Sequence, residues 1–171
     1  MSRIRSYSMK LISIFCLAII ALGCEIQYGM LDNSIEADTF SVDIFEDKAA
    51  NAPAGYGADF TEHLRDFLVS RSKMKLRSEK ADLEISGSIK RYYTQAAAVQ
   101  SNEDAALNSL RVTIEVSVIN NLDETQSFEK DFNQLSNFES STDLASVEES
   151  LLEDINDKLS QDILNELSKN W

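Results

Sequence analysis

Residues 110–118 place the strongest constraint on how this chain of 171 residues folds. Apolar side chains occupy every second position of the segment, and polar side chains lie between them. The apolar positions are Leu110, Val112, Ile114, Val116 and Val118. Strict alternation of this kind predicts a β-strand with one buried face. A polar turn at 120–125 then predicts an antiparallel hairpin with a returning strand over about 126–135.

The sequence does not determine the register of the returning strand. Phe128 and Phe132 are in phase, but Lys130 falls between them on the same face. Either a bulge shifts the register or this face is partly solvated.

Two further strands precede the hairpin. Residues 39–45 alternate, with Phe40, Val42 and Ile44 expected to face the core. A longer strand begins near residue 83, where Leu83, Ile85 and Ile89 share a face and Gly87 marks a bulge or a close backbone approach. Met74 and Leu76 indicate a short edge strand before it. Residues 95–107 either extend the long strand or loop out.

Two segments have helical spacing. Residues 58–72 place Phe60, Leu64, Phe67 and Leu68 on one stripe, after a loop at 47–57. Residues 147–169 form a long helix with an apolar residue every fourth position and an acidic outer face. Its apolar row is Leu151, Ile155, Leu159, Ile163 and Leu167. Ser146 and Glu149 match a capping box at its start.

The order of these elements predicts an α+β fold, β-α-β-β-β-α. Half-apolar strands are best satisfied by a mixed, mostly antiparallel four-stranded sheet with two helices packed on one face. We expect one such domain over residues 38–171.

The N-terminus resembles that of a bacterial lipoprotein. Three basic residues precede an apolar run at 11–22, which is typical of a signal peptide and too short to span a bilayer. Residues 21–24, Ala-Leu-Gly-Cys, resemble a lipobox, so we expect removal of 1–23, lipidation of Cys24 and a tether at 24–37. The alternative is an ordinary signal peptide with Cys24 as a nearby thiol.

The charge of the processed chain excludes several functions. Removing residues 1–23 removes three basic residues and no acidic one, which leaves 13 basic and 29 acidic residues and a formal charge of −16. This balance argues against broad nucleic-acid binding, and it also disfavours loose adsorption onto anionic lipid. Cys16 leaves with the signal peptide and Cys24 is the lipid site, so we expect no internal disulfide.

The sequence contains no recognisable catalytic, cofactor or metal site. His63 is the only histidine and lies at the border of a helical apolar stripe, so no histidine–cysteine zinc set can form. No calcium-loop spacing occurs among the acids. Gly55-Tyr56-Gly57 lacks the third glycine and the alternating fold of a dinucleotide site, and we interpret it as a turn. We therefore expect no enzyme activity and no cofactor.

Basic residues cluster in the middle of the chain. Eight of the 13 lie between positions 65 and 91, which creates a local positive patch that suits phosphate oxygens. The alternative is a solvated strand edge whose lysines deter aggregation. The candidate contacts for an anionic ligand are Arg71, Lys73, Lys75, Arg77, Lys90 and Arg91.

Many short segments together resemble one family, the LptE-type lipopolysaccharide-assembly lipoproteins, in their Bacteroidetes-type branch. The matching segments are the lipobox ending at Cys24, 38–42, 60–66, 81–87, 100–110, 128–130, 146–149 and 170–171. The resemblance covers nearly the whole chain, and its specificity comes from the order of these matches.

The resemblance implies a non-catalytic lipoprotein on the periplasmic side of the outer membrane. It would act as partner and plug of the LptD β-barrel during lipopolysaccharide transport and assembly. The candidate basic contacts would then meet the phosphates of lipopolysaccharide. Two alternatives stay open: a lipid-anchored module that binds another periplasmic ligand, and a lipid-anchored hydrolase with a carboxylate pair.

Overall fold

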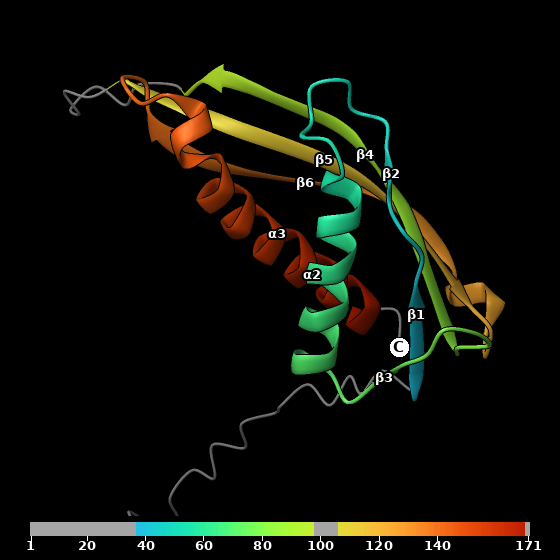
Figure 1. The fold of residues 1–171 in the computed structure, drawn as a ribbon. Coiled ribbons are helices and arrows are strands. Elements are labelled where there is room, and N and C mark those ends of the chain that lie inside the picture. Colours follow the sequence, from blue (N-terminus) through green and yellow to red (C-terminus); the bar gives the residue numbers. More distant parts are fainter. Residues whose placement is uncertain (1–36, 98–105, 170–171) are drawn as a thin grey trace, which may run out of the picture. The chain divides into compact units, whose positions relative to one another are not determined.

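The computed structural model describes residues 37–97 and 106–169, and Figure 1 shows their fold. The predicted signal peptide, the lipidation site Cys24 and nearly all of the predicted tether lie outside the described residues. The described residues belong to one compact unit, Asn33–Trp171. It is a mixed α+β fold in which two helices cover one face of an open sheet, as the sequence predicts (Figure 1).

Three long antiparallel strands form most of the sheet. They are β4 (Leu83–Ala96), β5 (Leu107–Asn120) and β6 (Phe128–Glu139), and a 3₁₀ turn at Glu124–Gln126 joins the last two. The predicted hairpin is therefore confirmed. All five apolar positions of 110–118 are buried at 2% exposure or less, because β5 is the strand between two neighbours.

The N-terminal strands add to β4 in parallel. The sheet order is β3-β1-β4-β5-β6, with β1 (Thr39–Val42) between β4 and β3 (Lys75–Leu76), while β2 (Glu46–Asp47) also pairs with β4. The sheet thus has six strands, and the predicted number of four is too low. The short edge strand indicated by Met74 and Leu76 is present as β3 but is not included in the predicted count, and β2 is missed because two residues cannot show an alternating pattern.

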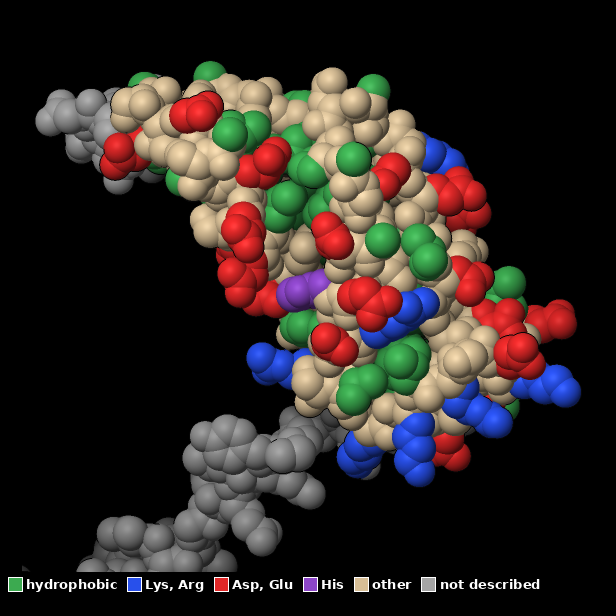
Figure 2. Space-filling model, in the orientation of Figure 1, with side chains coloured by type: hydrophobic (Ala, Val, Ile, Leu, Met, Phe, Trp, Pro, Cys, Tyr) green, Lys and Arg blue, Asp and Glu red, His purple; other side chains and the backbone are tan. Residues whose placement is uncertain are grey.

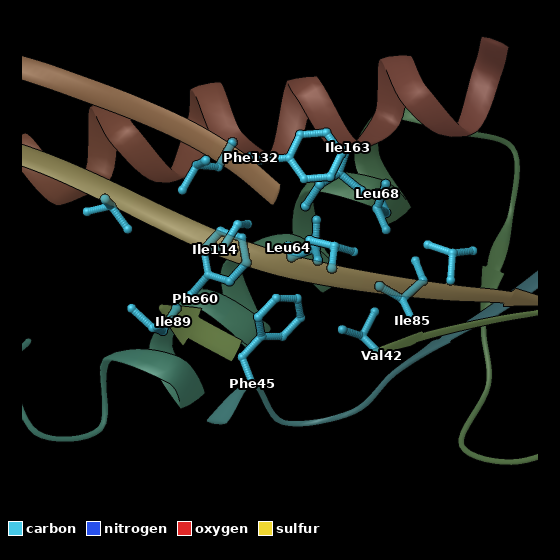
Figure 3. Close-up of a cluster of buried hydrophobic side chains, with 14 of the residues drawn as sticks. Val42, Phe45, Phe60, Leu64, Leu68, Ile85, Ile89, Ile114, Phe132 and Ile163 are labelled. Carbon is cyan, nitrogen blue, oxygen red and sulfur yellow. The ribbon is translucent and has the colours of Figure 1, made fainter. Parts of the chain in front are cut away.

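The helices pack as their apolar stripes predict. α2 (Tyr56–Arg71) buries Phe60, Leu64 and Leu68 of its predicted stripe, but Phe67 is only partly buried. α2 follows β2 and leads to β3, which is parallel to β1. α3 (Leu144–Lys169) buries the complete predicted row from Leu151 to Leu167. Figure 3 shows side chains from the strands and from both helices meeting in one apolar cluster.

Phe45, and not Ile44, faces the core. β1 ends at Val42, and the backbone N–H of Phe45 then donates to Thr61 Oγ1 of α2 at 2.9 Å. This contact turns the Phe45 ring inward against Phe60, with ring centroids 5.0 Å apart, and leaves Ile44 66% exposed. The predicted alternation over 39–45 is wrong in its last two residues because a side chain from another element ends the strand.

The close approach predicted at Gly87 is confirmed. A Cβ atom at this position would lie 2.2 Å from Glu115 O and 2.5 Å from Phe45 Cε1. The irregularity in the β4–β5 pairing lies further along, between Ile89 and Arg91.

The structure gives the register of β6 and corrects the predicted start of α3. β5 and β6 pair without a register shift, Lys130 lies opposite Val116, and its Nζ reaches Glu166 of α3 at 2.7 Å. The face is therefore partly solvated, without a bulge. The capping box at Ser146 is wrong, because α3 begins at Leu144 and the Ser146 hydroxyl donates to Asp143 O.

Candidate functional site

Most basic residues outside one region of the molecule are neutralised by neighbours. Six of the 13 form ion pairs with carboxylates of the described residues. These six are Lys48, Arg65, Lys90, Lys130, Lys158 and Lys169. Seven basic residues have no such ion pair within the described part of the chain. Five of these seven lie close together in the sequence, between positions 71 and 80. We call these five the basic end: Arg71, Lys73, Lys75, Arg77 and Lys80.

The end of α2 starts this group. Ser72 leaves the helical conformation, and its backbone N–H and hydroxyl both donate to Leu68 O, at 3.0 and 2.7 Å. These bonds satisfy a carbonyl at the helix end. Arg71 is the last helical residue, and its guanidinium lies 5.6 Å from the centre of the Phe67 ring.

The short strand β3 holds the next members. Met74 is buried at 4% exposure, so the exposed Lys73 and Lys75 flank a residue anchored in the core. Backbone bonds of 2.9 Å from Lys75 N–H to Asp38 O and of 2.8 Å from Arg77 N–H to Phe40 O fix β3 beside β1. The basic side chains therefore stand on an edge of the sheet, and Figure 2 shows basic residues gathered at the end of the molecule where α2 stops.

Asp82 holds the first described residues in this region. Its Oδ2 accepts from the backbone N–H groups of Asp38 and Thr39 at 3.0 and 2.9 Å, and from the Thr39 hydroxyl at 2.8 Å. The hydroxyl bond, assisted by the backbone bonds and the charge of Arg77, holds the pKa of Asp82 below its usual value. The entry of the chain into the domain is thereby fixed next to the basic end.

Lys90 and Arg91 are not part of the basic end. Lys90 Nζ lies on the sheet face opposite the helices, 2.9 Å from both Glu115 Oε2 and Asp131 Oδ1. These two hydrogen bonds raise the pKa of Lys90. Arg91 is exposed and pairs with Thr113 on the same outer face. The six predicted contact residues therefore divide into four that lie together and two that lie elsewhere.

The sequence could not reveal this division. The carboxylates that pair with Lys90 come from strands 25 and 41 residues away, so the pairing depends on sheet register. Lys80 belongs with the four clustered residues and was already visible in the basic run. No local pattern in the sequence indicates the role of Asp82, because its hydrogen-bond partners are about 43 residues away.

A second region of interest is a hollow of about 340 Å³ between α2, α3 and β6. Phe67, Arg71, Asp157 and Asp162 contribute to its wall, and Gln134 Nε2 donates to Asp162 Oδ2 at 2.6 Å. His63 lies nearby on α2, with Nε2 3.0 Å from Asp157 Oδ1 and its ring stacked on Phe67. This histidine joins two helices, and no described serine or threonine is hydrogen-bonded to it.

Other kinds of site are not found in the described ranges. No group of three histidine, cysteine or acidic side chains there is arranged to hold a metal ion. Neither of the two described helices is long and apolar enough to cross a membrane. The basic end is therefore the clearest candidate for a binding surface on the described residues.

Comparison with known families decides the identity of the chain. The family model for lipopolysaccharide assembly, LptE, matches residues 37–167. The chain belongs to the LptE family. The match covers the whole described domain up to the last turn of α3, and LptE membership supports a role in lipopolysaccharide assembly and an envelope lipoprotein. No curated protein matches the sequence.

Several solved structures are similar to this chain at low sequence identity. An uncharacterised lipoprotein B from Nitrosomonas europaea is 13% identical, with a TM-score of 0.50 and coverage of 85% of this chain and 90% of that one. A protein from Xanthomonas campestris is 10% identical, with a TM-score of 0.54 and coverage of 77% and 84%. A minor lipoprotein from Acinetobacter baumannii is 15% identical, with a TM-score of 0.49 and coverage of 78% and 94%.

Proposed function

We propose that this LptE-family chain is a non-catalytic lipoprotein of the outer membrane, held there by lipid on Cys24 and facing the periplasm. It acts as the partner and plug of the LptD β-barrel in lipopolysaccharide transport and assembly. The observation that carries this proposal is the family match over residues 37–167.

The N-terminal sequence supports the anchor. A basic start, a short apolar run and Ala-Leu-Gly-Cys at 21–24 are in the order that lipoprotein processing requires. Each buried CH₂ of an acyl chain contributes about 0.8 kcal/mol, so two or three chains hold a protein stably on a membrane.

The side chains of the described domain support a role without catalysis. His63 lies against Asp157 and Phe67 and has no hydrogen-bonded nucleophile among the described residues. The acidic residues nearest to Lys90 and Lys130 are occupied by ion pairs. These contacts give the named side chains structural roles within the domain, and the expectation of a partner comes from the family match.

Co-purification from detergent-solubilised outer membrane tests the proposal. We expect the tagged full-length protein to elute with a large β-barrel protein in a stable stoichiometric complex. A domain that elutes alone and monomeric under mild detergent contradicts the partnership. That result would favour the alternative of a lipid-anchored module for another periplasmic ligand.

A further inference from the structure

Among the described residues, most of the positive charge that lacks an ion pair is concentrated at one end of the domain. Each of the five residues of the basic end is exposed, and none has an ion pair with a described carboxylate. The formal net charge of the processed chain is nevertheless −16. At physiological ionic strength the Debye length is about 8 Å, so acids on other parts of the surface are screened. Of the acids at the same end, Asp82 accepts hydrogen bonds from Thr39 and Asp123 accepts them from Thr125, while Glu79 is exposed within the basic run.

Exposed apolar side chains accompany this charge. The described residues include six large hydrophobic side chains that are exposed, and two of them, Leu76 and Leu122, are 46% and 57% exposed. Leu76 belongs to β3, and Leu122 lies in the β5–β6 turn. Ile119 is 48% exposed and lies beside that turn, and Val69 is 50% exposed and lies near the end of α2.

The pairing of the strands brings these segments to the same end of the sheet. Leu76 lies opposite Phe40, Phe40 opposite Leu83, and Leu83 opposite Asn120. Asn121 N–H also donates to Asp82 O at 2.8 Å, which fixes the β5–β6 turn beside the Asp82 contacts. Basic and apolar side chains therefore share one end, a combination typical of surfaces that lie on a membrane.

The chain enters the domain at this same end. Asp38 bonds to both Lys75 and Asp82, so the segment that leads back to Cys24 starts beside the basic end. Twelve residues lie between Cys24 and Ala37, and these thirteen Cα–Cα steps can span at most about 45 Å. A lipid on Cys24 would hold this end of the domain nearest to the bilayer.

We propose that the basic end is the surface that the domain lays on a membrane, with anionic phospholipid headgroups as its ligand. The leaflet is the one that holds the acyl chains of Cys24, and this part of the inference rests on the proposed lipid anchor. Leu76 and Leu122 enter the headgroup layer, while the cations pair with phosphates. Lipopolysaccharide binding by the same residues stays a prediction and is the competing outcome below.

Vesicle binding by the unlipidated processed chain tests the basic end separately from the lipid anchor. The protein begins at residue 24 and carries Cys24→Ser, and the vesicles contain phosphatidylglycerol and phosphatidylethanolamine. Co-sedimentation is measured for the parent, for Lys73→Gln/Lys75→Gln, and for Lys48→Gln/Lys158→Gln. The two double variants lose the same charge, but Lys48 and Lys158 are outside the basic end.

We expect the parent to bind these vesicles at low ionic strength and not to bind neutral phosphatidylcholine vesicles. Each basic residue near an anionic membrane surface increases the partition coefficient about fivefold, which is equivalent to about 1 kcal/mol. The Lys73→Gln/Lys75→Gln variant should therefore bind the vesicles about 25-fold more weakly than the parent. The Lys48/Lys158 variant should stay within about twofold of the parent. Equal loss in both variants, no binding by the parent, or binding to lipopolysaccharide micelles alone would overturn the proposal.

Orientation is tested on the lipidated protein. Cys16 leaves with the signal peptide and Cys24 is acylated, so one introduced cysteine is the single free thiol of the chain. Ser78→Cys places a fluorophore at the basic end, and Ser141→Cys places it in the turn after β6, about 45 Å away along the 14-residue strands. We expect headgroup-bound quenchers to quench the label at 78 and to spare the label at 141.

The outcomes separate the two proposals. Equal quenching at both positions contradicts the membrane-facing surface even if the barrel co-purifies. Failure of acylation at Cys24 contradicts the anchor, whereas vesicle binding by the unlipidated chain is measured independently of it.

Discussion

At the scale of single residues, Gly87 shows how tightly the sheet and Phe45 are fitted together. A methyl group there would overlap both a backbone oxygen of β5 and the Phe45 ring. Only glycine leaves room for both, so the local approach of β4, β5 and the segment after β1 depends on this position.

Gly87→Ala should therefore destabilise the domain by about 1–3 kcal/mol, the usual cost of overpacking. Urea unfolding of the unlipidated chain measures the change. Ser86→Ala, next to it on the outer face, should stay within about 0.5 kcal/mol. Equal stability of Gly87→Ala and the parent would show that Phe45 can move aside without cost.

Asp82 makes a pH-dependent contribution to the stability of the folded domain. Its pKa is lowered in the folded state, chiefly by the hydrogen bond from the Thr39 hydroxyl. The stabilisation is thus complete above the unfolded-state pKa of about 3.9 and is lost as pH falls through the lower folded-state pKa.

We expect Asp82→Asn to be less stable than the parent at about pH 7 and about pH 5, with the difference shrinking below about pH 4. Unfolding midpoints of both proteins across this range give the measurement. A difference that is constant down to about pH 3 would mean that the carboxylate charge does not stabilise the entry of the chain.

At the scale of elements, the central strand β5 and the helix α3 follow their sequence periodicity most closely. Every predicted apolar position of both is buried, because each packs its whole length against one apolar layer. The shorter elements depend on contacts from elsewhere in the chain: β3 is held by backbone hydrogen bonds to Asp38 and Phe40.

The β5 prediction can be tested directly. Ile114 is fully buried at the centre of β5, so Ile114→Ala should cost about 2–5 kcal/mol through lost transfer energy and the cavity left behind. Denaturant unfolding is the measurement, and Ser117→Ala on the outer face is the control, with an expected change within about 0.5 kcal/mol. A loss for Ile114→Ala no larger than the control would mean that the core can collapse around this position.

At the scale of the whole molecule, an acidic domain carries five of the seven described cations that lack an ion pair at the end where the chain enters. The proposed lipid on Cys24 would orient that end, and family membership supports a role in lipopolysaccharide assembly. The proposed anchor and the folded domain would thus make separate contributions: the anchor would set the location of the protein, and the domain would provide its binding surfaces.

Cys24→Ser should prevent acylation and release the protein from the membrane fraction, because the acyl chains supply the anchoring free energy. Labelling with radioactive palmitate and membrane fractionation measure the two effects. The wild-type protein provides the positive control. A serine variant that stays equally membrane-bound, or a wild-type protein that takes up no palmitate, would contradict the anchor.

The sequence by itself determined the class of fold, the apolar faces of α2, β5 and α3, the hairpin and the expected lipidation site. These features depend on local periodicity or on a contiguous motif, which a single segment contains in full. The tertiary structure alone decided that Phe45 replaces Ile44 in the core, that Lys90 is paired, and that Asp38, Lys75 and Asp82 meet at one end. Those outcomes depend on sheet register and on partners many residues away, so no local pattern encodes them.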